Sequence, residues 1–279
     1  MVCGLWSSKK MPNDRNNPIG VFDSGLGGLT VVKELMHQLP SEDVVYFGDT
    51  ARVPYGTKSR ESIVRFSREN VSLLLKRKVK MVVVACNTSS SVALPVLRDS
   101  FPVPVVGVIA PGVRKAVEVT RTKRVGIIAT SATIHSQEYT REIRRLSPSL
   151  KVITQACGLF VPLVEEGWFK NATTTMIAEQ YLSKMKKAKV DTLILGCTHY
   201  PLLKSVIKKV MGDGVVLIDS AKEVAREVKQ LLEYTQKNSL SKRKGQAVFL
   251  VSDEPQHFQG LAKRFLGFSI EDVERCSDV

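Results

Sequence analysis

Two cysteines of this chain stand in matching sequence contexts, and their side chains could move protons. Cys86 follows the apolar run 81–85, and Cys197 follows a second, largely apolar run, 192–196. A threonine stands within two positions after each cysteine. Short β-branched runs are typical of buried strands, and the residues after them are expected to begin helices. The sequence therefore predicts two similar units, each made of a strand, a cysteine and a helix start.

A cysteine at such a junction lies where the helix dipole and free backbone N–H groups favour the thiolate. One such cysteine could equally be structural, because a free cysteine packs like a small apolar side chain. Two of them in matching contexts favour a shared site. If the two units face each other, one thiolate can remove a proton from a substrate carbon while the opposite thiol delivers one. This chemistry inverts a stereocentre and needs neither a metal nor a prosthetic group.

A third predicted strand ends at Asp23 and Ser24 and leads through a glycine-rich turn, residues 25–28, into a helix. Glycines let the backbone approach a ligand, and the N-terminus of the next helix can hold a carboxylate. The turn matches neither a Walker A loop nor the full GxGxxG fingerprint of dinucleotide sites. Asp23 is either a simple turn residue or an acidic group that binds an α-ammonium or modulates a nearby base.

Neutral hydrogen-bond donors follow the two cysteines, at Asn87, Thr88 and Thr198. Such side chains at helix N-termini suit an α-carboxylate. Tyr55 and Gly56 lie on a polar loop after another predicted strand. His199 is two positions past Cys197, where it could influence that thiol or hold a side-chain carboxylate. The remaining histidines, His37, His135 and His257, are interpreted as ordinary packing residues.

The elements that must position these residues alternate regularly from Pro18 onward. Strands are expected at residues 19–23, 44–47, 81–85, 103–108, 125–129, 152–155, 192–195, 215–218 and 248–251. Helices are expected at residues 30–39, 61–76, 134–146, 173–187 and 221–235. The alternation predicts an α/β fold with mainly parallel sheets, and nine strands suit two sheets better than one. Ser220 and Glu223 predict a capping box, and residues 236–245 a polar surface loop.

Four segments of the sequence resemble the signature segments of bacterial glutamate racemases. They are residues 22–29, 49–56, 85–88 and 196–201, and they occur in the family's order and at family-like separations. The resemblance extends from about Pro18 to at least Ala221. It implies that Cys86 and Cys197 are the paired acid and base, and that no cofactor or metal takes part.

The resemblance also implies a set of residues around that pair. The residues expected to line the substrate site are Asp23, Ser24, Tyr55, Gly56, Asn87, Thr88, Thr198 and His199. Asp23 and His199 are also expected to assist catalysis. Glu165 resembles the acidic residue that the family places near the two cysteines, although Glu166 adjoins it. Gly158 departs from the pattern, because the family more often has proline after the cysteine at this point.

The architecture that we expect is two flavodoxin-like α/β domains related by a pseudo-twofold axis, with the active site in the cleft between them. The resemblance implies that the first domain is discontinuous. It would comprise residues 18–108 and 221–279, with the second domain, residues 109–220, inserted between these parts. Residues 1–17 would form an N-terminal extension.

The activity implied by the resemblance is interconversion of L- and D-glutamate, which supplies D-glutamate for peptidoglycan synthesis. One alternative is a racemase for aspartate or for several amino acids, because pocket geometry decides which side-chain length is accepted. A second alternative is a non-catalytic regulator that binds nucleic acid. Loss of either cysteine would indicate such a role, and both cysteines are present.

The formal charge of +14 would ordinarily suggest a nucleic acid or an anionic membrane as partner. The basic residues are scattered, however, and no nucleic-acid-binding signature accompanies them. Apolar runs are far shorter than the ~18 residues of a membrane span, and no secretory signal begins the chain. Five widely spaced cysteines do not form a disulfide framework. We therefore expect a cytoplasmic protein with a small-molecule substrate and no specific nucleic-acid or membrane partner. A homodimer remains an open alternative.

Overall fold

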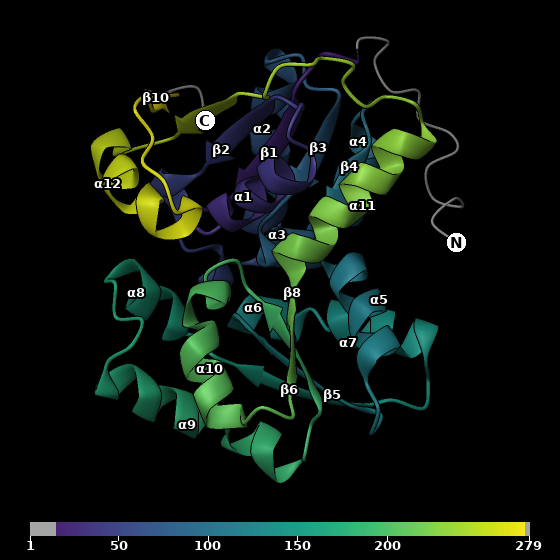
Figure 1. Ribbon diagram of the computed structural model, residues 1–279, viewed down its shortest axis with the longest axis vertical. Coiled ribbons are helices and arrows are strands. Elements are labelled where there is room, and N and C mark those ends of the chain that lie inside the picture. Colours follow the sequence, from purple (N-terminus) through teal and green to yellow (C-terminus); the bar gives the residue numbers. More distant parts are fainter. Residues whose placement is uncertain (1–14, 277–279) are drawn as a thin grey trace.

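The chain folds around two separate parallel β-sheets, as the computed structural model of residues 15–276 shows (Figure 1). The larger sheet has the strand order β10-β9-β2-β1-β3-β4, and the smaller has the order β6-β5-β7-β8. Every strand pair in the described residues is parallel. The prediction of an α/β fold with two mainly parallel sheets is thus confirmed. Most of the expected N-terminal extension, including Cys3, lies outside the described residues.

We call the two halves of the molecule the six-stranded lobe and the four-stranded lobe. The larger sheet consists of β1 (Ile19–Asp23), β2 (Val44–Gly48), β3 (Met81–Val84), β4 (Val105–Gly107), β9 (Ala247–Val251) and β10 (Glu274–Arg275). The smaller consists of β5 (Arg124–Ala129), β6 (Lys151–Ala156), β7 (Thr192–Gly196) and β8 (Val216–Asp219). β1, β3 and β7 are buried along their whole length, which explains their nearly continuous apolar sequences.

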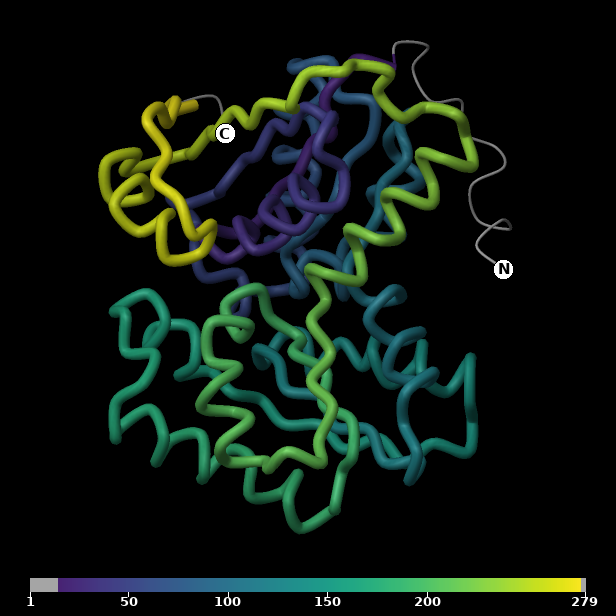
Figure 2. The backbone as a smooth tube through the Cα atoms, in the orientation of Figure 1, coloured from purple at the N-terminus to yellow at the C-terminus, as the bar shows by residue number. Residues whose placement is uncertain are grey.

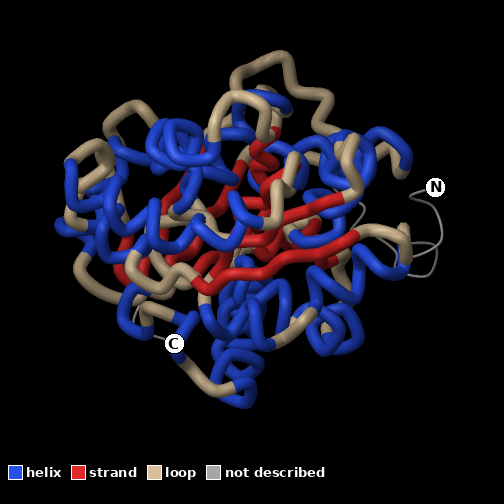
Figure 3. Tube along the Cα trace, turned by 90° about the horizontal axis from the view of Figure 1, so that it is seen from below, coloured by secondary structure: helices blue, strands red, loops and turns tan. Residues whose placement is uncertain are grey.

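Helices surround both sheets, and Figure 3 shows the strands enclosed by them. The helices of the six-stranded lobe are α1 (Leu29–Gln38), α2 (Arg60–Lys76), α3 (Asn87–Val92), α4 (Leu94–Ser100), α11 (Ser220–Tyr234) and α12 (Pro255–Leu266). Those of the four-stranded lobe are α5 (Ile109–Val119), α6 (Ser131–His135), α7 (Glu138–Leu146), α8 (Phe160–Glu165), α9 (Ala172–Lys187) and α10 (Lys204–Met211). Short 3₁₀ turns are η2 (Thr50–Arg52), η3 (Tyr55–Thr57) and η4 (Tyr200–Leu203). No helix among the described residues has both the length and the apolar character needed to cross a bilayer.

Two local expectations were wrong. The helix expected at residues 134–146 is two helices, because Gln137 adopts a left-handed backbone conformation with φ of 57° between α6 and α7. The predicted cap of α11 is also one residue off. The carboxylate of Asp219 accepts a 3.0 Å hydrogen bond from the backbone N–H of Ala221, whereas Ser220 is already helical. A carboxylate in that position satisfies an N–H that the helix itself leaves unpaired.

The chain leaves the six-stranded lobe after β4 and returns to it at α11 (Figure 2). As a result, β2 has neighbours from distant parts of the sequence. It pairs with β1 on one side and with β9 on the other, where Tyr46 is in register with Phe249. The six-stranded sheet is therefore assembled from both ends of the chain.

A buried ion pair lies at the amino end of the larger sheet. Lys80, just before β3, is fully buried and pairs with Glu42, just before β2. The Lys80 ammonium also donates to the backbone carbonyls of Arg15 and Lys237, at 2.8 and 3.0 Å. The second oxygen of Glu42 accepts from the backbone N–H of Ser239 at 2.6 Å. The pair therefore ties the polar loop expected at residues 236–245 to the sheet.

Candidate active site

Cys86 and Cys197 line one small pocket between the lobes. Each follows the carboxyl end of a buried strand, β3 for Cys86 and β7 for Cys197. The pocket is lined by Ser24, Val53, Pro54, Tyr55, Gly56, Cys86, Asn87, Thr88, Thr130, Val161, Gly196, Cys197, Thr198 and His199. Its volume is about 20 Å³, enough for about one water molecule. An amino acid can enter only if the surrounding segments move apart.

Cys86 has the environment of a thiol that stays protonated. It is the N-cap residue of α3, and its Sγ lies 3.8 Å from the hydroxyl of Ser24. Burial, and then the nearby charge of Asp23, raise the pKa of Cys86 to about 12. At neutral pH the Cys86 side chain is therefore a proton donor in this closed arrangement.

Cys197 has a different partner, a histidine that carries a positive charge. Nδ1 of His199 lies 3.9 Å from the Cys197 Sγ, and Nε2 lies 3.1 Å from a carboxylate oxygen of Glu165. Burial disfavours the protonated ring, but the hydrogen bonds with Cys197 and Glu165 outweigh it and raise the pKa of His199 to about 10. An imidazolium beside a cysteine stabilises its thiolate. The two thiols therefore have differently charged neighbours, a cation beside Cys197 and the carboxylate of Asp23 near Cys86.

The glycine-rich turn brings β1 against the end of β7. A Cβ at Gly27 would lie 2.1 Å from the hydroxyl oxygen of Thr198 and 2.6 Å from Nδ1 of His199, so only glycine fits. Asp23, at the end of β1, is completely buried and accepts hydrogen bonds from the Gly25 N–H at 3.1 Å and the Thr198 hydroxyl at 3.4 Å. Burial raises the pKa of Asp23 despite these bonds and the nearby His199.

Polar side chains from both lobes meet on the side of Cys86. The hydroxyl of Thr88 lies 3.0 Å from that of Thr130 and 3.2 Å from that of Thr133. The Asn87 amide donates to the Tyr139 hydroxyl at 2.8 Å. The other amide atom of Asn87, Oδ1, is buried without a partner in the described part of the chain. That atom is available to a ligand in the pocket.

The Tyr55 hydroxyl is already committed to the protein. It donates to Asp49 and accepts from the Asn70 amide at 3.1 Å. Asp49 also pairs with Arg52 at 2.7 Å. This network fixes the loop that carries Tyr55 and Gly56. The loop lines the pocket, whereas the Tyr55 hydroxyl is bound by Asp49 and Asn70, which do not line it.

All the site residues expected from the sequence lie at this site, either lining the pocket or directly behind a lining residue. Nine of them line the pocket: Ser24, Tyr55, Gly56, Cys86, Asn87, Thr88, Cys197, Thr198 and His199. Asp23 lies behind Thr198, and Glu165 lies behind His199. It is Glu165, and not its neighbour Glu166, whose carboxylate contacts the histidine.

Thr130 is the main polar residue of the pocket that sequence reasoning missed. It stands at the end of β5, and its hydroxyl caps α6 by accepting from the Thr133 N–H at 3.4 Å. A strand end followed by a capping threonine is a signal that the sequence contained. Val53, Pro54, Val161 and Gly196 complete the lining, and no chemical pattern distinguishes them in the sequence.

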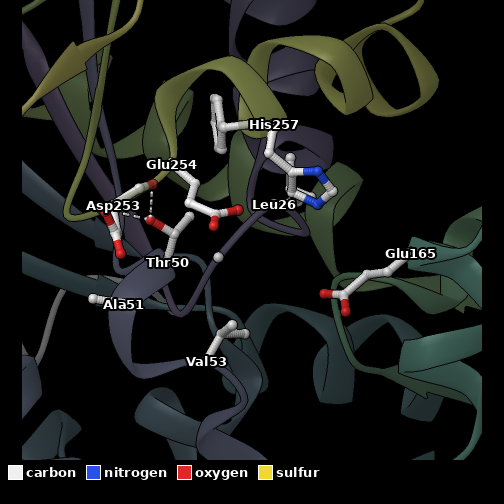
Figure 4. Close-up of a pocket in the computed structure, with 10 residues that line it drawn as sticks. Leu26, Thr50, Ala51, Val53, Glu165, Asp253, Glu254 and His257 are labelled. Carbon is white, nitrogen blue, oxygen red and sulfur yellow. Dashed lines mark hydrogen bonds between the residues drawn. The ribbon is translucent and has the colours of Figure 1, made fainter.

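A wider pocket of about 320 Å³ adjoins the closed one, and we call it the outer pocket. Val53 lines both. Figure 4 shows Glu165 on one side of the outer pocket, with Asp253, Glu254 and His257 on the other. His257 lines this pocket and is exposed, as are His37 and His135, so the interpretation of these three histidines as packing residues was wrong. Because Glu165 also contacts His199, the two pockets meet at the Glu165 side chain.

Comparisons with known proteins point to one family. Residues 19–228 match the family model described as Asp/Glu/hydantoin racemase. The chain is 51% identical to the glutamate racemase of Geobacter metallireducens over 93% of this chain and 96% of that protein. The crystal structure of a Bacillus anthracis glutamate racemase superposes with a TM-score of 0.91 at 39% identity, covering 94% of this chain and 98% of that one. The Francisella tularensis glutamate racemase, solved in complex with D-glutamate, gives a TM-score of 0.89 at 39% identity, covering 95% and 98%.

Proposed function

This chain belongs to the Asp/Glu/hydantoin racemase family, and from that premise we propose that it moves the α-proton of glutamate between Cys86 and Cys197. It is an isomerase that interconverts L- and D-glutamate, as its similarity to glutamate racemases along most of the chain supports. The observation that most directly supports the two-cysteine mechanism is the single pocket lined by both thiols.

The charged neighbours of the two cysteines favour one starting arrangement. The Cys197 thiolate, paired with the His199 imidazolium, removes the α-proton of L-glutamate, and the Cys86 thiol protonates the opposite face of the carbon to give D-glutamate. Cys197 ends as the thiol and Cys86 as the thiolate, so D-glutamate is converted by the reverse transfers. The high pKa of Cys86 supports its role as the acid in the first direction.

The remaining residues bind and orient the substrate. Thr88 and Thr198 offer hydrogen bonds for its carboxylates, together with Ser24 and the backbone of Tyr55 and Gly56. The unpartnered Oδ1 of Asn87 can instead accept a hydrogen bond from the substrate ammonium. The charge of Asp23 raises the pKa of Cys86, which supports a role for Asp23 in modulating that thiol. Both ring nitrogens of His199 face protein groups, which supports a role for His199 beside Cys197 over one in binding the substrate carboxylate.

The biological setting and the domain limits are also proposals. We propose that the enzyme works in the cytoplasm and supplies D-glutamate for peptidoglycan. We propose that the domains comprise residues 18–108 with 221–279 and residues 109–220, in agreement with the positions of the two sheets along the chain. The glutamate racemases among the relatives favour glutamate over aspartate as the substrate.

The function is tested by circular dichroism of the purified enzyme with L-glutamate, D-glutamate and aspartate, without added cofactor. We expect both glutamate enantiomers to converge to zero ellipticity and aspartate to remain largely unchanged. An alkylating reagent should abolish the activity, and glutamate should protect against it, because the reactive thiols lie in the substrate pocket. Activity that is lost on dialysis and restored by pyridoxal phosphate or a metal would exclude the proposed mechanism.

Replacing His199 by asparagine should change the pH dependence of racemisation. Because the pKa of His199 is raised to about 10, its positive charge is present below that pH and is lost above it. Without this cation the proposed Cys197 thiolate loses the positive charge beside it, so the acidic limb of kcat/KM should move to higher pH. The activity at pH 7 should fall about tenfold for every pH unit by which that limb moves. It should recover as the pH rises.

The matched control is His37→Asn, which replaces an exposed histidine on α1. It should retain the pH profile of the unmodified enzyme. A His199→Asn variant with lower activity but an unchanged acidic limb would show that His199 does not stabilise the Cys197 thiolate.

A further inference from the structure

Helix α12 of the six-stranded lobe contacts both Glu165 and His199, the pair beside Cys197, although these two residues belong to the four-stranded lobe. An Nη of Arg264 donates a 3.0 Å hydrogen bond to the backbone carbonyl of Glu165. The next residue, Phe265, places its ring edge-on to the His199 ring, with centroids 5.7 Å apart and an interplanar angle of 88°. Two successive residues of one helix therefore contact the backbone of Glu165 and the imidazole of His199.

We propose that Arg264 and Phe265 are positioning residues that hold Glu165 and His199 against Cys197, so that the Cys197 half of the reaction depends on α12. This inference rests on the proposed function and adds helix α12 to the elements that the reaction requires. The two lobes must separate to admit glutamate, and α12 restores the geometry of the pair when they come together.

The Arg264 contact is placed where a cation is favourable. Glu165 is the last residue of α8, and carbonyls at a helix C-terminus lack partners within the helix and carry partial negative charge. Gly167 makes room for the guanidinium. Its φ is 79°, and a Cβ there would lie 2.8 Å from an Arg264 Nη, so a side chain would displace the arginine. A hydrogen bond to the Glu165 backbone fixes the start of the side chain that reaches His199.

The Phe265 contact fixes the orientation of the imidazole. Phe265 and His199 are both only 3% exposed, so the ring pair is buried. An edge-to-face contact favours one plane of the His199 ring. That plane directs Nδ1 to Cys197 and Nε2 to Glu165.

The contacts made by Arg264 and Phe265 are on the Cys197 side of the pocket. Cys86 is contacted by Ser24 and influenced by Asp23, both from the six-stranded lobe. Within residues 15–276, neither Arg264 nor Phe265 shares a hydrogen bond or a ring contact with Ser24 or Asp23. A defect in the α12 contacts should therefore fall on Cys197 and spare Cys86.

Net racemisation cannot reveal this asymmetry. The two enantiomers have an equilibrium constant of one, so kcat/KM must be equal in both directions in every variant. Elimination from the separate enantiomers of N-hydroxyglutamate can reveal the asymmetry. In this reaction the α-proton passes to one thiolate, a C–N double bond forms, and the N–O bond breaks with loss of water after protonation. The imine then hydrolyses to 2-oxoglutarate and ammonia. Each enantiomer needs only the cysteine that faces its α-proton.

With Arg264→Ala we expect kcat/KM for elimination from the L-enantiomer to fall about fivefold, the effect of losing one ordinary hydrogen bond at a solvent-exposed site. Elimination from the D-enantiomer should change by less than about twofold, within the effect of an ordinary surface substitution. The acidic limb of the L-reaction should also move to higher pH. Arg264→Lys should restore most of the activity, because an ammonium can donate to the same carbonyl. Phe265→Leu, which keeps apolar volume, should show the same preference for damage to the L-reaction.

Lys263→Ala is the matched control, since it removes the adjacent exposed cation of the same helix, and it should leave both eliminations unchanged. Equal losses on the two enantiomers, or no loss on either, would overturn the inference while leaving the two-thiol mechanism intact. Failure of the unmodified enzyme to racemise glutamate would instead overturn the proposed function itself.

Discussion

Replacing either Cys86 or Cys197 by serine should reduce net racemisation by about a thousandfold, the scale of general acid–base catalysis. A serine hydroxyl has a pKa far too high to act as the base near neutral pH. Either substitution also leaves only one thiol in the pocket that both cysteines line. Each variant should nevertheless retain one half of the chemistry, because an eliminating substrate needs a base on one face only.

The measurement is elimination from the two N-hydroxyglutamate enantiomers. Cys86→Ser keeps Cys197 and should process the L-enantiomer, and Cys197→Ser keeps Cys86 and should process the D-enantiomer. The control is Cys276→Ser, which changes a partly exposed cysteine near the end of the described chain and should retain full activity. If both active-site variants retained the same enantiomer, or if either racemised glutamate at a near-normal rate, the two-thiol mechanism would be wrong.

Replacing Glu42 by alanine should lower the free energy of unfolding by about 3–5 kcal/mol. The substitution leaves the fully buried Lys80 ammonium without its carboxylate and frees the backbone N–H of Ser239. Removing one member of a buried ion pair is costly because the charge that stays buried loses its carboxylate partner in a medium of low polarity. Since natural proteins have total stabilities of about 5–15 kcal/mol, the loss should be visible as a large fall in the urea midpoint.

Urea unfolding of Glu118→Ala provides the comparison. The Glu118 side chain is 67% exposed and pairs with Lys115 on the surface of α5, and such pairs contribute about 0–1 kcal/mol. The double variant Lys80→Met with Glu42→Leu should recover much of the loss, because no charge is then left buried. A Glu42→Ala midpoint equal to that of Glu118→Ala would show that the buried pair does not stabilise the amino end of the larger sheet.

The sequence identified the strands well because each is a short, nearly continuous apolar run in a sheet covered on both faces. It failed where the outcome depends on a single backbone conformation. The break at Gln137 needs a positive φ that glutamine adopts rarely. Helix α12 begins after another such residue, Glu254, with φ of 49°, and no helix was expected there. The shift of the α11 cap to Asp219 was equally local, since both residues are suitable caps.

The site was predictable to the extent that its residues are contiguous with a strand end. Cys86 and Cys197 lie on such segments, and their repeated context distinguishes them within the sequence itself. The partners supplied by tertiary packing were not visible. Thr130 approaches Thr88 from the other lobe, and Arg264 reaches Glu165 across 99 residues of sequence. Contacts of this kind depend on how the two lobes meet, which no local pattern encodes.

The position of β2 between β1 and β9 also determines the order in which the molecule can be completed during synthesis. A ribosome releases residues 44–48 early and residues 247–251 only after every strand of the four-stranded lobe. Until then, one edge of β2 has no neighbouring strand, and its backbone N–H and C=O groups remain open to pairing with another chain. The sheet with which the polypeptide begins is therefore the last one that a nascent chain can close.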